Sequence, residues 1–449
     1  MKGVLSPRWA SATEIAGRIA RAELSAEAFA RELLQRVHET EPRVQAWAWL
    51  DPDHLLAQAR AFDERCRLGQ AGGPLGGLPV AVKDIIDVAG LPTEDGTVLH
   101  AGRIADSDAA VVTALRRVGG LPMGKSVTTE LATYAAGKTR NPHDLAHSPG
   151  GSSSGSAAAV AAGMAPLAIG TQTNGSVIRP AAFCGVVGFK PSFGCISRAG
   201  VLTQSPTLDQ IGVFARTVDD AALLAQALFG HDERDPATRP LPVPPLADIA
   251  RSEPPAQPRF AWIATPWWDR VAPDARAAFG ELLARLGGSA VPRELPTDAE
   301  GAIDRHRTIM EADIAGSYES DYERDRDRLS PSLRAQIERG REVTAVQYRR
   351  AVEGIPPLVA ALDPLFAEFD AILTPATLGT APRFEDGTGD PLMCTLWTLC
   401  GVPAVSLPLL RGANGLPLGV QLVGRRGDDA RLLRTARWLA AHAERTGAG

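Results

Sequence analysis

Cysteine is scarce in this sequence, and its spacing suits neither disulfides nor zinc. The 449 residues include five cysteines, none of them in a CxxC pair and none beside histidines at zinc-ligand spacing. An odd number of cysteines in a chain without a secretion signal predicts reduced thiols, most of them buried. Cys184 lies in an apolar run and Cys400 precedes Gly401, so we expect both to pack in the core and not to act as nucleophiles.

The chain also lacks an excess of basic residues and any apolar run of membrane length. Its 47 Lys and Arg are outnumbered by 52 Asp and Glu, which gives a net charge of −5 and a pI near 6.0. No nucleic-acid partner is therefore expected. The N-terminal stretch has no uninterrupted apolar segment of the kind found in secretory signals, and no window contains the roughly eighteen apolar residues of a membrane span. We expect a soluble, cytoplasmic protein with no membrane partner.

Two motifs suggest a bound metal or nucleotide, but the local structure expected around each does not suit such a site. The spacing of His143 and His147 would suit a metal on a helix, but Pro142, Pro149 and the glycines that follow place the pair in a loop. The stretch 119–126 matches the phosphate-loop pattern GxxxxGK[ST], yet a helix and not a strand is expected before it, and its proline removes one backbone donor. We expect no metal and no cofactor, with nucleotide binding as a minor alternative.

Helical and strand patterns alternate along most of the chain. The predicted helices cover residues 11–43, 52–68, 108–118, 128–134, 156–163, 215–228, 274–286, 298–350, 359–369, 392–399 and 428–442. The predicted strands cover residues 78–82, 121–124, 166–170, 260–264, 371–375, 404–408 and 418–423. Proline and charge dominate residues 231–258, which we interpret as a surface excursion or internal linker.

Two glycine-serine clusters flank a helix of small residues in the middle of the chain. The first covers 150–155 (GGSSSG) and the second covers 171–176 (TQTNGS). Each glycine in an ordered segment costs about 0.5–1 kcal/mol relative to alanine, so their number here calls for a reason. Glycine beside an ordered serine lets the backbone approach a ligand and direct several N–H groups at one point. That geometry stabilises an oxyanion.

A lysine ends a strictly apolar predicted strand. Residues 78–82 lead directly into Lys83, and a lone lysine in such a place most often reaches out to solvent. Together with the two serine clusters, it indicates serine catalysis without histidine, because serine needs a base within hydrogen-bond reach. Lysine can be that base when burial lowers its pKa toward the working pH.

Four longer motifs make the chain similar to the amidase signature family. They cover 78–84 (LPVAVKD), 149–153 (PGGSS), 175–181 (GSVIRPA) and 185–191 (GVVGFKP), with weaker similarity over 73–228 and 370–424. The resemblance implies an α/β fold, in which one large domain has a mixed, twisted central sheet covered by helices on both faces. It also implies hydrolysis of C–N bonds in amides, with carbamates (urethanes) and aryl esters as related substrates.

The resemblance assigns roles to individual residues. It implies that Lys83 is the base, that Ser152 is a bridging serine in a cis peptide bond, and that Ser176 is the nucleophile that forms the acyl-enzyme. Neutral Lys83 would take a proton from Ser152, which would take one from Ser176 as it attacks the carbonyl. The backbone N–H groups expected to hold the oxyanion are those of Thr173, Asn174, Gly175 and Ser176, and the residues expected to bind substrate are Gly150, Gly151, Thr129 and Asn174.

Three residues near these serines depart from the family pattern. Gln172 stands where the family usually has aspartate, Asn174 stands where it has glycine, and Ser154 replaces a glycine of the first cluster. We expect these changes to affect the substrate range and not the catalytic set. Arg179 and Asp209 match charged family positions, and we expect both to be architectural.

We expect a single domain over residues 1–449, made of four parts. These parts are an N-terminal helical layer (1–70), a signature core (71–230), a variable substrate-entrance region (231–350) and a C-terminal part of the core (351–449). Trp262, Trp267 and Trp268 in the third part would suit an aromatic substrate, although core packing explains them equally well.

The leading functional prediction is hydrolysis of a small-molecule amide or carbamate. The alternative is a glutaminase component of a transamidation complex, because the family includes the component that supplies ammonia for amide formation on charged transfer RNA. The lack of a basic excess counts against that alternative. An inactive scaffold is disfavoured because lysine and both serines are present. Homodimers are the commonest oligomers, which makes a homodimer the default expectation.

Overall fold

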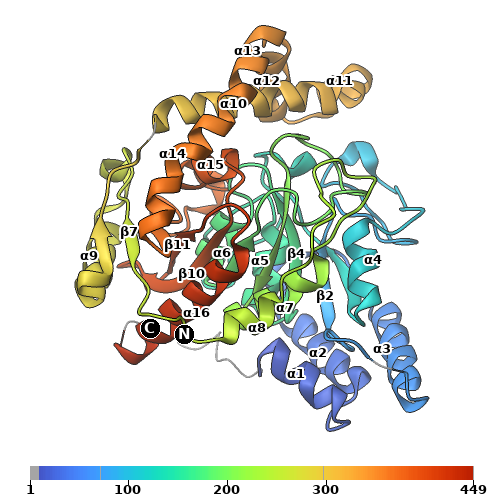
Figure 1. Ribbon diagram of the computed structural model, residues 1–449. Helices are drawn as coiled ribbons and strands as arrows, with labels where there is room; N and C mark the ends of the chain where they lie inside the picture. The colour runs from blue at the N-terminus through green and yellow to red at the C-terminus, as the bar shows by residue number, and fades with distance from the viewer. Residues whose placement is uncertain (1–9, 71, 297, 448–449) are drawn as a thin grey trace.

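One mixed sheet organises the computed structural model, which describes residues 10–70, 72–296 and 298–447 (Figure 1). Its eleven strands in this described part are β1 (Trp47–Trp49), β2 (Pro79–Lys83), β3 (Leu121–Ser126), β4 (Leu167–Gln172), β5 (Val187–Lys190), β6 (Gln210–Ala215), β7 (Phe260–Trp262), β8 (Ala290–Pro292), β9 (Ala371–Pro375), β10 (Ala404–Arg411) and β11 (Pro417–Val423). They lie in the order β1-β3-β2-β4-β6-β5-β10-β11-β9-β7-β8. Neighbours from β4 to β9 are antiparallel, whereas β2 runs parallel to β3 and β4, and β7 runs parallel to β8 and β9.

Helices cover both faces of this sheet (Figure 1). On one face, α5 (Ser154–Ala161) and α6 (Ile178–Cys184) pack against each other and against the central strands. On the other face, α7 (Val218–Leu228), α8 (Leu246–Arg251) and α16 (Asp429–Arg445) pack together. Between them, apolar strand residues such as Val82, Ile169 and Val213 are fully buried. The predicted fold class, a single α/β domain with a mixed sheet between helices, is confirmed.

The other helices of the described chain form outer layers, except α15, which is buried along its whole length. They are α1 (Ala12–Ala20), α2 (Ala26–Val44), α3 (Pro52–Arg67), α4 (Ala110–Arg117), α9 (Pro273–Leu286), α10 (Ala299–Ser317), α11 (Glu319–Asp325), α12 (Pro331–Arg341), α13 (Ala345–Glu353), α14 (Ile355–Glu368) and α15 (Leu392–Leu399). Single 3-10 turns cover η1 (Val98–His100), η2 (Glu130–Ala132), η3 (Trp268–Arg270), η4 (Gly287–Ser289), η5 (Arg326–Arg328) and η6 (Phe384–Asp386). In Figure 1, α1 to α3 lie at the bottom and α10 to α13 at the top.

Glycines in the strands let α6 lie close to the sheet. A Cβ atom on Gly188 would lie 2.5 Å from the Cβ atom of Ala181, and one on Gly419 would lie 2.5 Å from that of Ala182. Carbon atoms that are not bonded cannot approach so closely, so a larger residue would displace the helix. Because α6 begins just after Ser176, these glycines fix the position of that serine relative to the sheet.

The segment 231–350 adds to the sheet and also builds a separate layer. It supplies β8, which forms one edge of the sheet, and β7 next to it, while α10 packs against α12, α13 and α15. The prediction that 231–258 is only an excursion or linker is wrong in part, because α8 lies inside it and buries Leu246, Ala247 and Ala250. Sequence reasoning missed α8 because prolines surround a helix of only six residues.

Three elements of the signature stretch escape the sequence pattern. β5, β6 and α6 were not predicted, because nearly every residue in this stretch is buried and neither alternation nor helical periodicity marks the elements. The predicted helix 128–134 is replaced by the single turn η2. There Leu131 and Ala132 have φ values of 44° and 57°, which end regular helix at once.

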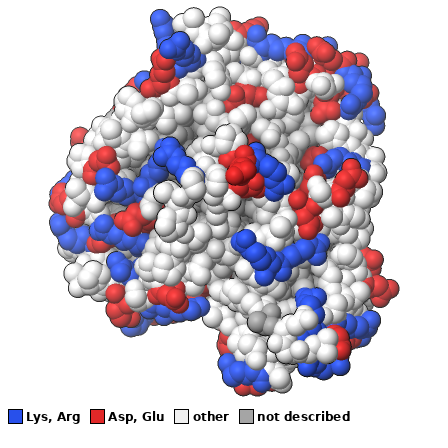
Figure 2. Space-filling model, turned by 45° about the vertical axis from the view of Figure 1, so that its right-hand side comes forward, with Lys and Arg blue, Asp and Glu red and all other residues white. Residues whose placement is uncertain are grey.

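Charged residues of both signs share the surface. On the face shown in Figure 2, Lys and Arg are interspersed with Asp and Glu, and neither sign covers a wide area. Among the described helices, none is both long and apolar enough to cross a membrane.

Candidate active site

Parallel pairing of β2 and β4 brings Lys83 to the serine clusters. Val82 pairs with Ile169, so the carboxyl ends of the two strands meet at one edge. Lys83 Nζ lies 2.7 Å from Ser152 Oγ and 2.7 Å from Thr171 Oγ1, within hydrogen-bond distance of both. Sequence reasoning paired Lys83 with Ser152 through the resemblance and missed Thr171, which nothing in the local pattern distinguishes.

Burial makes Lys83 a much weaker base than a lysine in water. Its side chain is fully buried, and this desolvation lowers its pKa from 10.5 to about 7, opposed by the negative charge of Asp209. A substantial part of the Lys83 population is therefore neutral near neutral pH, and a neutral amine accepts a proton.

The loop that carries Ser152 is held by the backbone around it. The peptide bond between Gly151 and Ser152 is cis, as the resemblance implied. Arg179 Nη2 donates to the Gly151 carbonyl at 2.7 Å, and Ser154 Oγ donates to the Gly150 carbonyl at 2.7 Å. Arg179 and Ser154 thus fix the loop through its backbone oxygens.

The neighbouring Ser153 has a different environment from Ser152. Its hydroxyl donates to the Thr171 carbonyl at 3.1 Å and accepts from the Thr171 N–H at 3.2 Å. The side chain is fully buried and turned toward β4. Ser153 therefore ties the loop to the strand, and Ser152 alone of the two contacts Lys83.

The turn between β4 and α6 presents free backbone donors. Among the described residues, none accepts a hydrogen bond from the N–H groups of Thr173, Asn174, Gly175 or Ser176. The next two N–H groups, of Val177 and Ile178, donate to Gln172 Oε1 at 2.8 and 3.0 Å. Successive free N–H groups in one turn form a site for an anion or an oxyanion.

Gln172 holds this turn in place. Besides accepting the two N–H groups, its Nε2 donates to Thr398 Oγ1 at 2.8 Å. We expect Gln172→Leu to lower the free energy of unfolding by about 2 kcal/mol, because two buried N–H groups lose their acceptor. Gln172→Glu keeps that acceptor and should cost less. Thermal denaturation of both variants checks this, and a Leu variant as stable as the original protein would contradict it.

Ser176 lies at the end of the same turn with its hydroxyl unengaged. Its side chain is almost buried, and within the described chain its hydroxyl makes no hydrogen bond. The structure thus contains the Lys83–Ser152 contact of the expected relay but no hydrogen bond between Ser152 and Ser176. Such contacts often tighten only when substrate is bound.

Thr173 is fixed from two sides. Its hydroxyl donates to Asp209 Oδ1 at 2.6 Å, and its carbonyl accepts from His306 Nε2 at 2.9 Å. Burial raises the pKa of Asp209 to about 6 and lowers that of His306 to about 4. Neither residue was predicted to contact this turn, since Thr173 and His306 are 133 positions apart in sequence.

A pocket of about 430 Å³ opens beside the turn. Asn174 lines it, donating from Nδ2 to Tyr134 Oη at 3.2 Å and accepting at Oδ1 from Thr395 Oγ1 at 2.6 Å. The opposite wall comes from α10 and α12, which include His306 and Gln336. Among the residues predicted to bind substrate, Asn174 is the one that lines this pocket.

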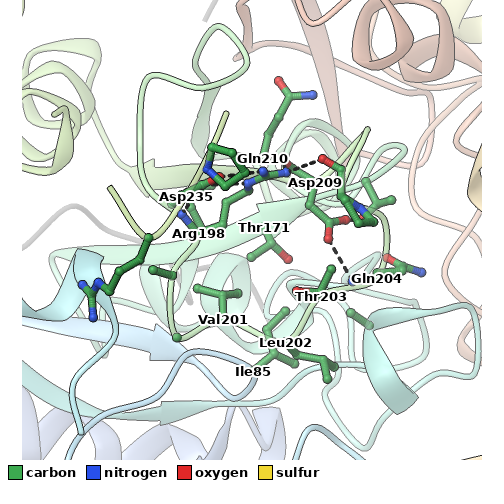
Figure 3. A pocket seen from close by; sticks show the side chains of 18 residues that line it. Ile85, Thr171, Arg198, Val201, Leu202, Thr203, Gln204, Asp209, Gln210 and Asp235 are labelled. Atoms are coloured by element: carbon green, nitrogen blue, oxygen red, sulfur yellow. Dashed lines mark hydrogen bonds and ion pairs between the residues drawn. The ribbon is translucent and has the colours of Figure 1, made fainter. Parts of the chain in front are cut away.

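A second pocket, of about 280 Å³, lies on the Asp209 side (Figure 3). Thr171 and Asp209 point toward it, and Gln204 donates its backbone N–H to Asp209 Oδ2 at 2.8 Å. The pocket is therefore lined by Thr171, whose hydroxyl, like that of Ser152, accepts a hydrogen bond from Lys83 Nζ.

The other predicted substrate-binding residues lie in the packed part of the site. Thr129 is fully buried, and its hydroxyl donates to the Thr133 carbonyl at 2.8 Å. A Cβ atom on Gly151 would lie 3.0 Å from the Thr129 methyl group, and one on Gly150 would lie 2.9 Å from Pro180. These glycines are needed for close packing of the Ser152 loop, and their contact with substrate stays a prediction.

In the two motifs that suggested a bound ligand, the lysine and both histidines contact other groups of the protein. Lys125 of the 119–126 stretch lies in β3, where its Nζ pairs with Asp84 Oδ1 at 3.1 Å. His143 Nε2 contacts the Cys184 carbonyl at 2.9 Å, and His147 Nδ1 pairs with Asp144 at 2.9 Å. Each of these side chains is therefore engaged by the protein itself.

Two of the three tryptophans of the third predicted part, Trp262 and Trp268, form a cluster. The rings of Trp262 and Trp268 are 5.3 Å apart, and Trp262 stacks on Phe279 at 5.5 Å. Neither tryptophan lines the two pockets next to Lys83 and Asn174. Packing, the second of the two explanations considered, accounts for them.

Comparison with known proteins agrees with this geometry. A family model described as Amidase matches residues 28–433. The chain is 36% identical to a glutamyl-tRNA(Gln) amidotransferase subunit from Acidothermus cellulolyticus, over 97% of this chain and 95% of that protein.

Solved structures are similar over nearly the whole length. The native peptide amidase from Stenotrophomonas maltophilia has a TM-score of 0.83 at 29% identity, with 98% of each chain covered. A chain from a vestigial protein complex that reveals the evolutionary origins of an s-triazine catabolic enzyme has a TM-score of 0.91 at 29% identity, covering 98% of this chain and 99% of that one. With its fold, its signature motifs and a family model that spans most of its length all in agreement, this chain belongs to the amidase family, enzymes that act on C–N bonds.

Proposed function

We propose that the protein hydrolyses the C–N bond of small-molecule amides through an acyl-enzyme on Ser176. The observation that carries this proposal is the contact of fully buried Lys83 with Ser152, next to a turn of four free N–H groups that ends at Ser176. A weakly basic lysine, a bridging hydroxyl and preformed oxyanion donors are the parts that acyl transfer by serine requires.

The proposed reaction runs in two halves. Ser176 Oγ bonds to the amide carbon while its proton passes to Ser152 and the Ser152 proton passes to neutral Lys83. The N–H groups of the turn stabilise the negative oxygen, each contributing roughly 3 kcal/mol. The C–N bond then breaks, and the leaving amine takes a proton from Ser152, which regains one from Lys83. Water releases the acid by the same relay, so that amide and water give acid and amine.

The same chemistry extends to carbamates and aryl esters, because each also has an acyl carbon with a leaving group. The pocket beside Asn174 is where we place the variable part of the substrate. Its position next to the turn supports Asn174 as a substrate-binding residue. Asn174 stands where the family usually has glycine, so its side chain would narrow or redirect the range of substrates that the enzyme accepts.

A second candidate function is supply of ammonia from glutamine within a transamidation complex. Several similar curated proteins are named as subunits of glutamyl-tRNA(Gln) amidotransferases, and such a name implies partner chains. The geometry favours it less, because both arginines that line the pocket are already paired: Arg339 with Glu311 and Arg307 with Asp304. Glutamine brings a carboxylate and an ammonium group that need free partners.

Amine or ammonia release from an aryl amide, an aryl carbamate, a primary amide and L-glutamine separates the two functions. Turnover of the aryl or primary amide without partner chains supports the amidase, and the preferred substrate narrows the class. Release from glutamine alone supports the second candidate. If none of the four is hydrolysed, we would have to abandon hydrolysis of simple amides.

A further inference from the structure

Gln336 is a buried amide without a partner. It lies on α12, is 4% exposed, and its Oε1 atom is buried with no hydrogen bond. Within the described residues, its side chain forms no hydrogen bond at all, and it lines the pocket beside Asn174. Buried polar groups are nearly always paired in proteins, so one that is unpaired at the wall of a pocket requires an explanation.

His306 offers a second unused polar atom in the same pocket. Because its Nε2 atom faces the Thr173 carbonyl, that nitrogen must carry the hydrogen. Burial lowers the His306 pKa to about 4, so the ring is neutral and its Nδ1 atom is an acceptor. Nδ1 has no partner among the described residues, while the ring lines the pocket.

Much of the remaining lining is apolar or already paired. Met310 and Leu392 supply apolar surface, and Arg339 forms hydrogen bonds to Glu311 at 2.6 and 3.0 Å. Tyr134 Oη accepts from Asn174, so its O–H is a further donor at this pocket. Gln336 and His306 add one amide, which both donates and accepts, and one imidazole acceptor. A neutral amide complements this set, because it supplies a carbonyl acceptor and an N–H donor.

We propose that this pocket recognises a second, uncleaved amide group of the substrate, which pairs with the Gln336 amide and directs an N–H at His306 Nδ1. The proposal rests on the proposed function and gives it a substrate class: small amides that carry a further neutral amide a few bonds from the one that is cleaved. Removing either partner from such a buried pair leaves the other unsatisfied, which makes the recognition selective.

Three p-nitroanilides of the same length test this selectivity. N-acetylglycine p-nitroanilide has the second amide, the 4-oxopentanoyl analogue keeps only its carbonyl, and the pentanoyl analogue has neither group. We expect kcat/KM to fall along this series, by about 10-fold or more from first to last. Gln336→Met should reduce this ratio to below about threefold. Gln35→Met, the same change at an exposed glutamine of α2, should leave the ratio and the rates unaltered.

Binding gives a test that does not depend on turnover. Calorimetry with Ser176→Ala protein should show tighter binding of N-acetylglycinamide than of pentanamide, and Gln336→Met should abolish the difference. Equal affinity for the two ligands overturns the inference, even if hydrolysis is seen. A binding preference without hydrolysis of any anilide supports the pocket and contradicts the proposed function instead.

The stability of Gln336→Met distinguishes recognition from a structural role. An amide that has no partner in the free protein adds nothing to its stability, so the Met variant should melt at the same or a higher temperature. A markedly lower melting temperature would mean that Gln336 supports the fold, and would overturn the inference.

Discussion

Ser176→Ala is expected to abolish amide hydrolysis, lowering kcat by about 10,000-fold or more, with the fold intact. The hydroxyl lies at the end of the turn whose N–H groups are free, and it makes no hydrogen bond within the described chain. Its loss should therefore cost little stability. Ser152 is hydrogen-bonded to Lys83, so in the proposed relay it transfers a proton and does not attack the carbonyl. Steady-state kinetics on the preferred substrate gives the measurement.

The acyl-enzyme itself can be observed. The original protein should release the first equivalent of p-nitroaniline in a burst when deacylation is slow, and hydroxylamine should divert the acyl group to a hydroxamate. Ser176→Ala should show neither. Ser153→Ala is the matched control: its hydroxyl bonds only to the Thr171 backbone, so the variant should lose some stability and keep measurable activity. Full activity in Ser176→Ala would refute the assignment.

The motifs that resemble the amidase signature family predicted the fold class, and the roles proposed for Lys83, Ser152 and Ser176 come from the same short, unbroken motifs. Lys83 ends an apolar strand, and Ser152 and Ser176 sit in glycine-rich turns, so each can be recognised from its neighbours in the sequence. The meeting of Lys83 and Ser152 follows from parallel pairing of β2 and β4, which a sheet of this class makes natural.

The walls of the site could not be predicted in the same way. His306 meets Thr173 across 133 positions, and Gln336 lines the pocket beside Asn174 from a helix that carries no motif. Their helices show ordinary amphipathic patterns, in which a buried glutamine or histidine looks like any other interruption of the apolar face. Only the packing of α10 against α12 and α15 brings them to the turn, and this packing depends on tertiary contacts.

The same distinction explains the elements that were missed. β5, β6 and α6 are buried on all sides, and glycines such as Gly188 replace the large apolar residues by which a strand is usually recognised. These glycines are required by the close approach of α6. The glycines that make these elements hard to recognise in the sequence are therefore the residues that let α6 position Ser176.

Lys83→Met is expected to lower kcat/KM by about 1,000-fold or more, because methionine has nearly the same length but cannot accept a proton. Lys83 is fully buried, so an apolar replacement is tolerated by its surroundings, although Ser152 and Thr171 each lose a hydrogen bond. Thermal denaturation should therefore show a folded protein. Lys83→Arg should be equally inactive, since a guanidinium group stays protonated at all working pH values.

The pH profile of the original protein tests the role of the amine directly. Burial lowers the Lys83 pKa to about 7, and only the neutral amine accepts the proton of Ser152. Activity should thus be low below pH 7, rise through it and level off above it. The negative charge of Asp209 favours the protonated amine, so Asp209→Asn should lower the Lys83 pKa further and move the rise toward lower pH. A merely structural role for Asp209 would lower the rate without moving the midpoint. A rate independent of pH from about 5 to 9 would rule out lysine as the base, because a base with the pKa of Lys83 must change the rate within that range.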